Sequence, residues 1–311
     1  MLARLLAATL IGLMCSVPAF AQGAEPSAQA RTGQVRVVLD EPANEKHRQI
    51  RAMMLERQIP QAVQALLGPF RLPRELTILV KSCEGREGAF YDNGVAAFCY
   101  EYAELIERHA PKVATPWGVS RADAIVGGIL DTILHEAGHG VFEILEIPVF
   151  GREEDAADFF SVYLQLQFPD ESAKRLIQGV AYMMGSEARA DFAGALKPFA
   201  LSGAHSMNAQ RYYNVLCLAY GANPDLVGSA VPPGMSPWRA GTCGDEYAML
   251  KRAFVKLILP HVDEAKLREG IAGLRFNWGE LATAREKFDS VPIGAEVAAE
   301  DARVGRGAAS R

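Results

Sequence analysis

The amino-acid sequence predicts an α+β fold, in which a small sheet with a hairpin packs beside one buried helix and the C-terminal half is mainly helical. Strand-like segments come first along the chain, and helical segments follow. Asn93-Gly94 separates two short strand-like runs and is a strong signal for a two-residue hairpin turn. Residues 120–146 are apolar on nearly every side of a helix, which is typical of a helix in the middle of a domain.

The N-terminal elements follow from hydrophobic periodicity and from the residues that interrupt it. A helical pattern over residues 44–67 is interrupted at Pro60 and ends near Gly68-Pro69. The other expected elements are strands at 35–39 (VRVVL), 75–81 (ELTILVK), 88–92 and 95–100, and a helix at 101–109.

The long apolar helix has a recognisable beginning and end. Ser120 and Asp123 have the spacing of a capping box, with Asp in place of the usual Glu or Gln. Gly127-Gly128 either weakens this helix locally or lets another element approach it closely. Residues 147–151 (IPVFG) end it. Further helices are expected at 153–168, 171–184, 208–220 and 245–259, and the proline- and glycine-rich residues 221–242 predict a long loop.

The N-terminus has the features of an export signal. Arg4 precedes an apolar run at residues 5–17, and Ala19-Phe20-Ala21 fits a small-x-small cleavage pattern. An uncleaved membrane anchor is the alternative. We expect export to the periplasm or full secretion, and no transmembrane segment in the mature chain. The expected organisation is a signal peptide (1–21), a flexible arm (22–33), one domain (34–294) and a disordered tail (295–311).

Charge and cysteine content restrict the partners and the compartment. The formal net charge of −5 provides no basic surface for nucleic acid. Cys15 leaves with the signal peptide, and an even number of cysteines in an exported protein predicts disulfides. A cysteine zinc site is the weaker alternative, because no Cys-x-x-Cys spacing occurs. The sequence does not determine the oligomeric state. Proximity along the chain favours the pairs Cys83–Cys99 and Cys217–Cys243.

The predicted buried helix carries the pattern H-E-x-x-H at residues 135–139. His135 and His139 are four residues apart, so both imidazoles lie on one helix face and can bind one zinc ion. Glu136 lies between them and can take a proton from a water molecule at the metal. The alternative is a pair of hydrogen-bonded core histidines with Glu136 in an ion pair.

A catalytic zinc site needs a third protein ligand. Glu154 and Asp158 lie on one face of the next helix, so Glu154 can bind the metal while Asp158 accepts a hydrogen bond from a ligand histidine. Glu143 is a competing ligand, because it continues the face of the two histidines. Glu153 and Asp155 are expected to point into solvent. An alternative for the whole acidic cluster is favourable charge at a helix N-terminus.

These motifs resemble those of zincin metallopeptidases whose third ligand is a glutamate. Glu154 to Asp158 (EDAAD) is similar to the E-x-x-A-D form of membrane-embedded prenyl-protein proteases and their periplasmic relatives. The chain more closely resembles a group of bacterial metallopeptidases, over residues 75–250. The softer matches to that group are Ala89-Phe90-Tyr91-Asp92, Cys99-Tyr100-Glu101 and Gln210-Arg211-Tyr212-Tyr213-Asn214. The transmembrane helices of the prenyl-protein proteases are missing, so their substrates do not carry over.

The resemblance implies a zincin-like fold in which a strand upstream of the metal helix pairs with an extended peptide. Residues 95–99 are the candidate strand, and an ordinary core strand is the alternative. Peptide hydrolysis also needs a donor for the developing oxyanion. His205, in a loop-like stretch just before a helix, is the catalytic candidate. The alternative is an ordinary exposed histidine, which is the more common case for a lone histidine in a loop. Arg211, Tyr212 and Tyr213 also lie downstream.

The sequence thus predicts an exported zinc metallopeptidase that acts on a peptide or protein substrate. In this reading His135, His139 and Glu154 bind Zn²⁺, Glu136 is the general base and Asp158 orients a histidine ligand. The alternative is a non-catalytic, zinc-stabilised binding module of the cell envelope.

Overall fold

The computed structural model describes residues 34–115, 118–192, 201–228, 231–232 and 234–279. The expected signal peptide (1–21), arm (22–33) and tail (295–311) lie outside these residues. Within them the chain forms a four-stranded sheet followed by a largely helical C-terminal half, which confirms the α+β class.

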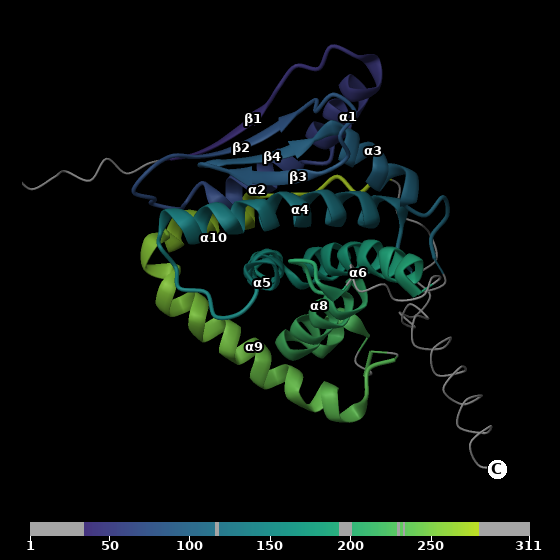
Figure 1. Ribbon diagram of the computed structural model, residues 1–311, viewed down its shortest axis with the longest axis vertical. Helices are drawn as coiled ribbons and strands as arrows, with labels where there is room; N and C mark the ends of the chain where they lie inside the picture. Colours follow the sequence, from purple (N-terminus) through teal and green to yellow (C-terminus); the bar gives the residue numbers. More distant parts are fainter. Residues whose placement is uncertain (1–33, 116–117, 193–200, 229–230, 233, 280–311) are drawn as a thin grey trace, which may run out of the picture. The chain divides into compact units, whose positions relative to one another are not determined.

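The sheet has the strand order β1-β2-β4-β3 (Figure 1). β1, β2 and β4 run parallel, and β3 pairs with β4 in the antiparallel sense. The β3–β4 connection is the expected hairpin turn, since Asn93 and Gly94 have φ values of 45° and 85°. β4 therefore has a partner on each side, and β3 is an edge strand. The strands span Val35–Leu39 (β1), Leu76–Lys81 (β2), Ala89–Asp92 (β3) and Val95–Cys99 (β4).

The predicted buried helix is α4 (Arg121–Ile144), and it lies between the sheet and a layer of further helices (Figure 1). It packs against β3 and β4 on one side and against α5 (Glu153–Gln165) and α6 (Asp170–Phe192) on the other. Ser120 accepts a hydrogen bond from the backbone N–H of Asp123, whose side chain accepts one from the Ser120 N–H. The capping box is therefore formed.

α4 and α6 cross closely at two glycines. A Cβ atom on Gly127 would lie 2.5 Å from the Leu176 carbonyl oxygen, and one on Gly179 would lie 1.9 Å from the Asp123 carbonyl oxygen. Of the two expectations for Gly127-Gly128, the close approach of another element is the one observed. The crossing places α6 against the helix that carries the H-E-x-x-H pattern.

We expect Gly179→Ala to lower the free energy of unfolding by about 1–3 kcal/mol, because the added methyl group must push the two backbones apart. Urea denaturation of both proteins measures the difference. Gly241→Ala is the matched control, since Gly241 lies in a helix and a Cβ there meets no atom within 4 Å. Equal stability of the two variants would contradict the role assigned to Gly179.

The C-terminal helices differ in three places from those predicted. α6 continues to Phe192, beyond the expected end at residue 184. α9 begins at Pro237, so the loop expected over residues 221–242 was wrong for its last six residues. Proline suits the first turn of a helix, and Ser236 caps it by accepting from the Arg239 N–H. The structure also contains an unpredicted helix, α10, which Asp263 caps. The helices whose bounds have not yet been given are α1 (Glu45–Glu56), α2 (Ile59–Leu67), α3 (Tyr100–His109), α8 (Asn208–Ala222), α9 (Pro237–Leu257) and α10 (Glu264–Gly273), with 3₁₀ turns η1 (Pro224–Val227) and η2 (Leu259–His261).

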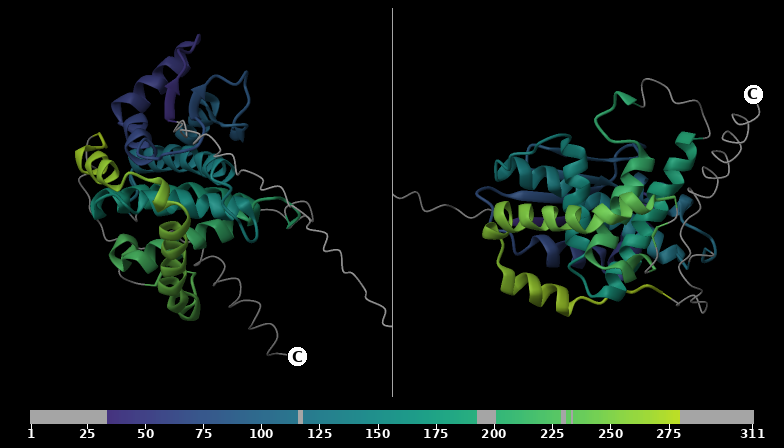
Figure 2. Two further views of the ribbon diagram at one scale, coloured as in Figure 1. Left: turned by 90° about the vertical axis from the view of Figure 1, so that its left-hand side faces the viewer. Right: turned by 90° about the horizontal axis from the view of Figure 1, so that it is seen from below.

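Two disulfides tie these elements together, with the pairing expected from the sequence. Cys83–Cys99 joins the segment after β2 to the end of β4, and Cys217–Cys243 joins α8 to α9. α9 packs along α8 on the side of the helical layer away from the sheet (Figures 1 and 2). In the part of the chain that the structure describes, none of the helices has the length and apolar character needed to span a bilayer.

Candidate metal centre

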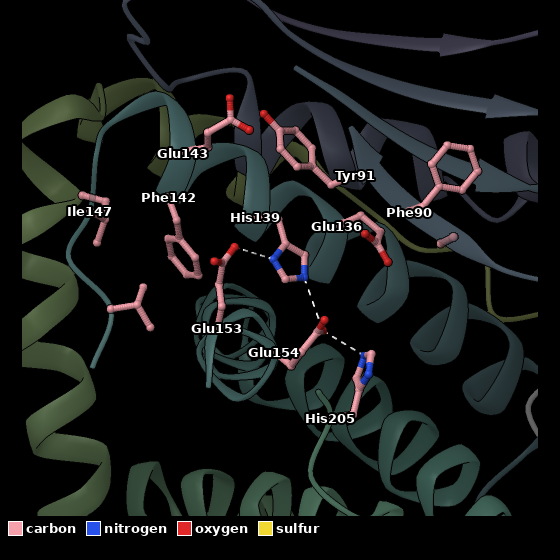
Figure 3. Close-up of a pocket in the computed structure, with 12 residues that line it drawn as sticks. Phe90, Tyr91, Glu136, His139, Phe142, Glu143, Ile147, Glu153, Glu154 and His205 are labelled. Carbon is pink, nitrogen blue, oxygen red and sulfur yellow. Dashed lines mark hydrogen bonds and ion pairs between the residues drawn. The ribbon is translucent and has the colours of Figure 1, made fainter. Parts of the chain in front are cut away.

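The predicted metal-binding side chains converge where α4 passes the beginning of α5, and Figure 3 shows two of them, His139 and Glu154. α4 presents His135 and His139 on one face, because residues four apart are one turn apart. The chain leaves α4 after Ile144 and returns as α5, so Glu154 in the first turn of α5 faces the two imidazoles.

Three donor atoms form a nearly equilateral triangle. His135 Nε2 lies 3.3 Å from His139 Nε2 and 3.1 Å from Glu154 Oε2, and His139 Nε2 lies 3.4 Å from the same oxygen. Metal–ligand distances of about 2.0–2.1 Å in a tetrahedral zinc site place neighbouring donors about 3.3 Å apart. The triangle therefore has the dimensions of one face of such a site.

The protonation of the two histidines also fits a cation. Each Nδ1 faces a carboxylate, at 2.8 Å from Asp158 for His135 and 2.8 Å from Glu153 for His139. A carboxylate accepts hydrogen bonds, so each Nδ1 carries a proton, and in the neutral imidazole each Nε2 then has a lone pair that can bind a metal. Two lone pairs and a carboxylate oxygen facing one another repel unless a positive charge lies between them. The residues present therefore fit a metal ion.

The outer carboxylates agree only in part with the prediction. Asp158 contacts His135 as expected, and its side chain is nearly buried. Glu153 is exposed, as expected, and its carboxylate in addition contacts the outer nitrogen of His139. Asp155 accepts a hydrogen bond from Ser206 at 2.9 Å. The first turn of α5 thus supplies contacts both to the candidate ligands and to the segment that carries His205.

The pKa values show that the site favours positive charge. Burial lowers the pKa of His135, but hydrogen bonds with Asp158 and Glu154 raise it well above its usual range. His135 lowers the pKa of Glu154, with further lowering by the charges of His205 and His139 that outweighs burial. Burial raises the pKa of Glu136, against the opposing charges of His135 and His139. A raised pKa suits a carboxylate that must accept and return a proton.

The site opens into a cleft of about 700 Å³ (Figure 3). Glu136, His139 and Glu154 line it, together with Glu143, the competing candidate for the third ligand. The Glu143 carboxylate is held by hydrogen bonds from Arg74 and Tyr91, beside the sheet. Because Glu154 contacts both histidines and Glu143 has other partners, the arrangement favours Glu154 as third ligand. The remaining lining residues are Ala89, Phe90, Tyr91, Phe142, Ile147, Val149, Glu153 and His205.

His205 reaches the cleft from the segment before α8. Its Nε2 atom lies 2.8 Å from Glu154 Oε2, and its ring stacks on His135 with the centroids 5.9 Å apart. Arg152 donates a hydrogen bond of 2.7 Å to the His205 carbonyl oxygen and so anchors this segment. His135, Glu154 and His205 also offer ligand atoms that all lie within 4.8 Å of one another.

The other downstream candidates lie away from the cleft. Tyr212 is 1% exposed and belongs to the core, while Tyr213 borders a separate groove with Asn214. Arg211 contacts Asp158 instead, with both carboxylate oxygens as acceptors. This contact was not predicted, because it joins α5 to α8 across a separation of 53 residues.

The prediction that residues 95–99 pair with a peptide was wrong. Residues 95–99 form β4, which is hydrogen-bonded to β2 and β3 on its two sides and has no free edge. Ala96 to Cys99 are buried, so the alternative reading of an ordinary core strand is the correct one. The neighbouring β3 is the edge strand, and Ala89, Phe90 and Tyr91 line the cleft.

Comparison with known proteins agrees with this geometry. Residues 39–258 match the sequence profile of a family described as "Putative metallopeptidase". The matched range includes all of the candidate ligands, Glu136 and His205. A search of curated proteins and a search of solved structures each found no match. Since the profile covers more than half of the sequence, the chain belongs to this metallopeptidase family.

Proposed function

We propose that this protein is an exported, zinc-dependent peptidase in which His135, His139 and Glu154 bind the metal. The observation that carries the proposal is the triangle of donor atoms, with sides of 3.1–3.4 Å, at the wall of an open cleft. Two nitrogens and one carboxylate oxygen are a ligand set that suits zinc. The family membership supports a metal-dependent peptidase.

A zinc ion held by His135, His139 and Glu154 would supply Lewis-acid activation of a water molecule. The residues of the chain do the rest. Glu136 accepts the proton of the attacking water and returns it to the leaving amine. Asp158 and Glu153 hold the two imidazoles in the tautomer that directs Nε2 inward. His205 donates a hydrogen bond to the carbonyl oxygen as negative charge develops on it.

We expect His205→Ala to lower kcat by about 10²–10³-fold, as loss of an oxyanion donor typically does, and to leave zinc content unchanged. Peptide cleavage and zinc content measured on the same preparation test this. His109→Ala is a control, because His109 lies at the end of α3 and is exposed. Loss of zinc from His205→Ala would instead show that His205 is a metal ligand.

The substrate is an extended peptide that adds to the free edge of β3. An edge strand offers unpaired backbone N–H and C=O groups, and β3 lines the cleft that contains Glu136. The two disulfides suit an oxidising compartment and agree with export to the periplasm or the medium.

The position of His205 favours one alternative, a zinc-stabilised binding module without catalysis. If His205 Nε2 coordinates zinc beside His135, His139 and Glu154, four protein ligands close the site, as in structural zinc centres. Glu136 then has no metal-bound water to act on. The His205→Ala variant separates the two functions, since it loses metal in one case and only turnover in the other.

The direct test is metal analysis and a peptide-cleavage screen on the purified full chain. We expect about one zinc per chain and cleavage that stops on chelation and returns with added zinc. A zinc content far below one per several chains under non-chelating conditions contradicts both functions. Full zinc occupancy without cleavage of any peptide favours the binding module.

A further inference from the structure

Asp158 is a buried carboxylate beside the candidate metal centre, and it is not one of the proposed metal ligands. Asp158 Oδ1 accepts a 2.8 Å hydrogen bond from His135 Nδ1. Arg211 donates from Nε to Asp158 Oδ2 at 2.7 Å and from Nη2 to Oδ1 at 2.8 Å. Asp158 is 3% exposed, so these contacts lie out of water.

We propose that Arg211 is a positioning residue for the metal centre: its two-point contact holds Asp158 so that His135 keeps Nε2 directed at the metal. The proposal rests on the proposed function, since it takes His135 as a metal ligand. Arg211 belongs to α8, which supplies no candidate metal ligand itself. The metal centre therefore depends on three helices, α4, α5 and α8.

The geometry of the contact gives the reason. Two parallel N–H···O bonds from a planar guanidinium fix the plane of a carboxylate, whereas a single bond lets it rotate. Fixing that plane fixes the direction of Oδ1, and hence the imidazole that donates to it. The positive charge of Arg211 also offsets the cost of burying the Asp158 carboxylate. The negative charges of Asp131 and Glu187 act on Arg211 as well.

The competing explanation is a purely structural ion pair that ties α8 to α5. Such a pair would affect folding and leave metal binding unchanged in the folded protein. The chain offers a matched control for it. Arg175 donates from Nε to Asp123 at 2.6 Å, and both side chains are about as buried as Arg211 and Asp158. That pair joins α6 to the beginning of α4, away from the candidate ligands.

The test measures metal affinity separately from activity. Zn²⁺ affinity is obtained by competition with a chelator, and the absorption spectrum of bound Co²⁺ reports ligand geometry. Arg211→Met should weaken Zn²⁺ binding by about 10- to 100-fold, as loss of a ligand-orienting partner typically does, and should change the Co²⁺ spectrum. Arg211→Lys keeps the charge without the planar fork, so its loss should be smaller. Arg175→Met should lower Tm and leave Zn²⁺ affinity, measured well below Tm, unchanged.

Unchanged Zn²⁺ affinity in folded Arg211→Met would overturn the proposal, as would an equal loss in Arg175→Met. If Arg211→Met does not fold, Arg211→Lys decides: a several-fold loss of affinity supports the proposal and wild-type affinity overturns it. A wild-type chain that binds neither ion contradicts the proposed function itself, and this inference falls with it. If the wild type binds Zn²⁺ and the Arg211 variants bind it with the same affinity, this inference alone is overturned.

Discussion

Replacing Glu136 with alanine should lower kcat for peptide hydrolysis by about 10²–10⁴-fold, the range that a positioned general base contributes. Glu136 lines the cleft beside His139, and burial raises its pKa toward a value at which it can take up and release a proton. No other assigned role of this side chain is lost, because the proposed metal ligands are His135, His139 and Glu154. Cleavage assays on wild type and variant, each loaded with zinc, measure the effect.

Zinc content is the control for this variant. Glu136→Ala should bind zinc as the wild type does, and Glu136→Gln, which keeps the size of the side chain, should be as inactive as the alanine variant. Equal turnover in wild type and Glu136→Ala would remove the proposed mechanism. Loss of zinc from both variants would show that Glu136 acts on the metal site and not on the reaction.

Replacing Glu154 with alanine should cost more zinc affinity than any change outside the ligand set. We expect a loss greater than the roughly 10- to 100-fold typical for a residue that only orients a ligand, together with loss of hydrolysis. The reason is that Glu154 Oε2 lies within 3.4 Å of Nε2 on both His135 and His139 and completes the triangle. Chelator competition measures the affinity, and thermal unfolding with and without zinc checks the fold.

Glu143→Ala is the matched control, because Glu143 is the same residue type in the same cleft. Its contacts are with Arg74 and Tyr91, so zinc affinity should be unchanged. The opposite result, with zinc lost in Glu143→Ala and kept in Glu154→Ala, would exchange the two roles. The comparison tests the third ligand without depending on any knowledge of the substrate.

Elements that are determined by residues close together in the chain were predictable from the sequence. The hairpin follows from Asn93-Gly94, and the beginning of α4 follows from Ser120 and Asp123, because the residues that make each structure are adjacent in the chain. The same holds for His135 and His139, which a helix brings together by spacing alone. Disulfide pairing by proximity also succeeded, at separations of 16 and 26 residues.

Features that depend on packing between distant segments were not predictable. The edge position of β3 depends on strand order, which no strand sequence specifies, so the peptide-pairing role was assigned to the central strand β4. Arg211 and Asp158 are 53 residues apart. The start of α9 was missed for a different reason: Ser236-Pro237 is a local signal for a helix start, and it was interpreted as part of a proline-rich loop.

The shortness of β3 has a consequence for the choice of substrate. The strand has four residues, and only alternate residues along an edge direct their backbone groups outward, so few main-chain hydrogen bonds are offered to a partner. In a folded substrate domain, the backbone N–H and C=O groups are already hydrogen-bonded within the domain's own secondary structure. Under the proposed function, unfolded or loosely attached peptide segments are therefore better substrates than intact domains.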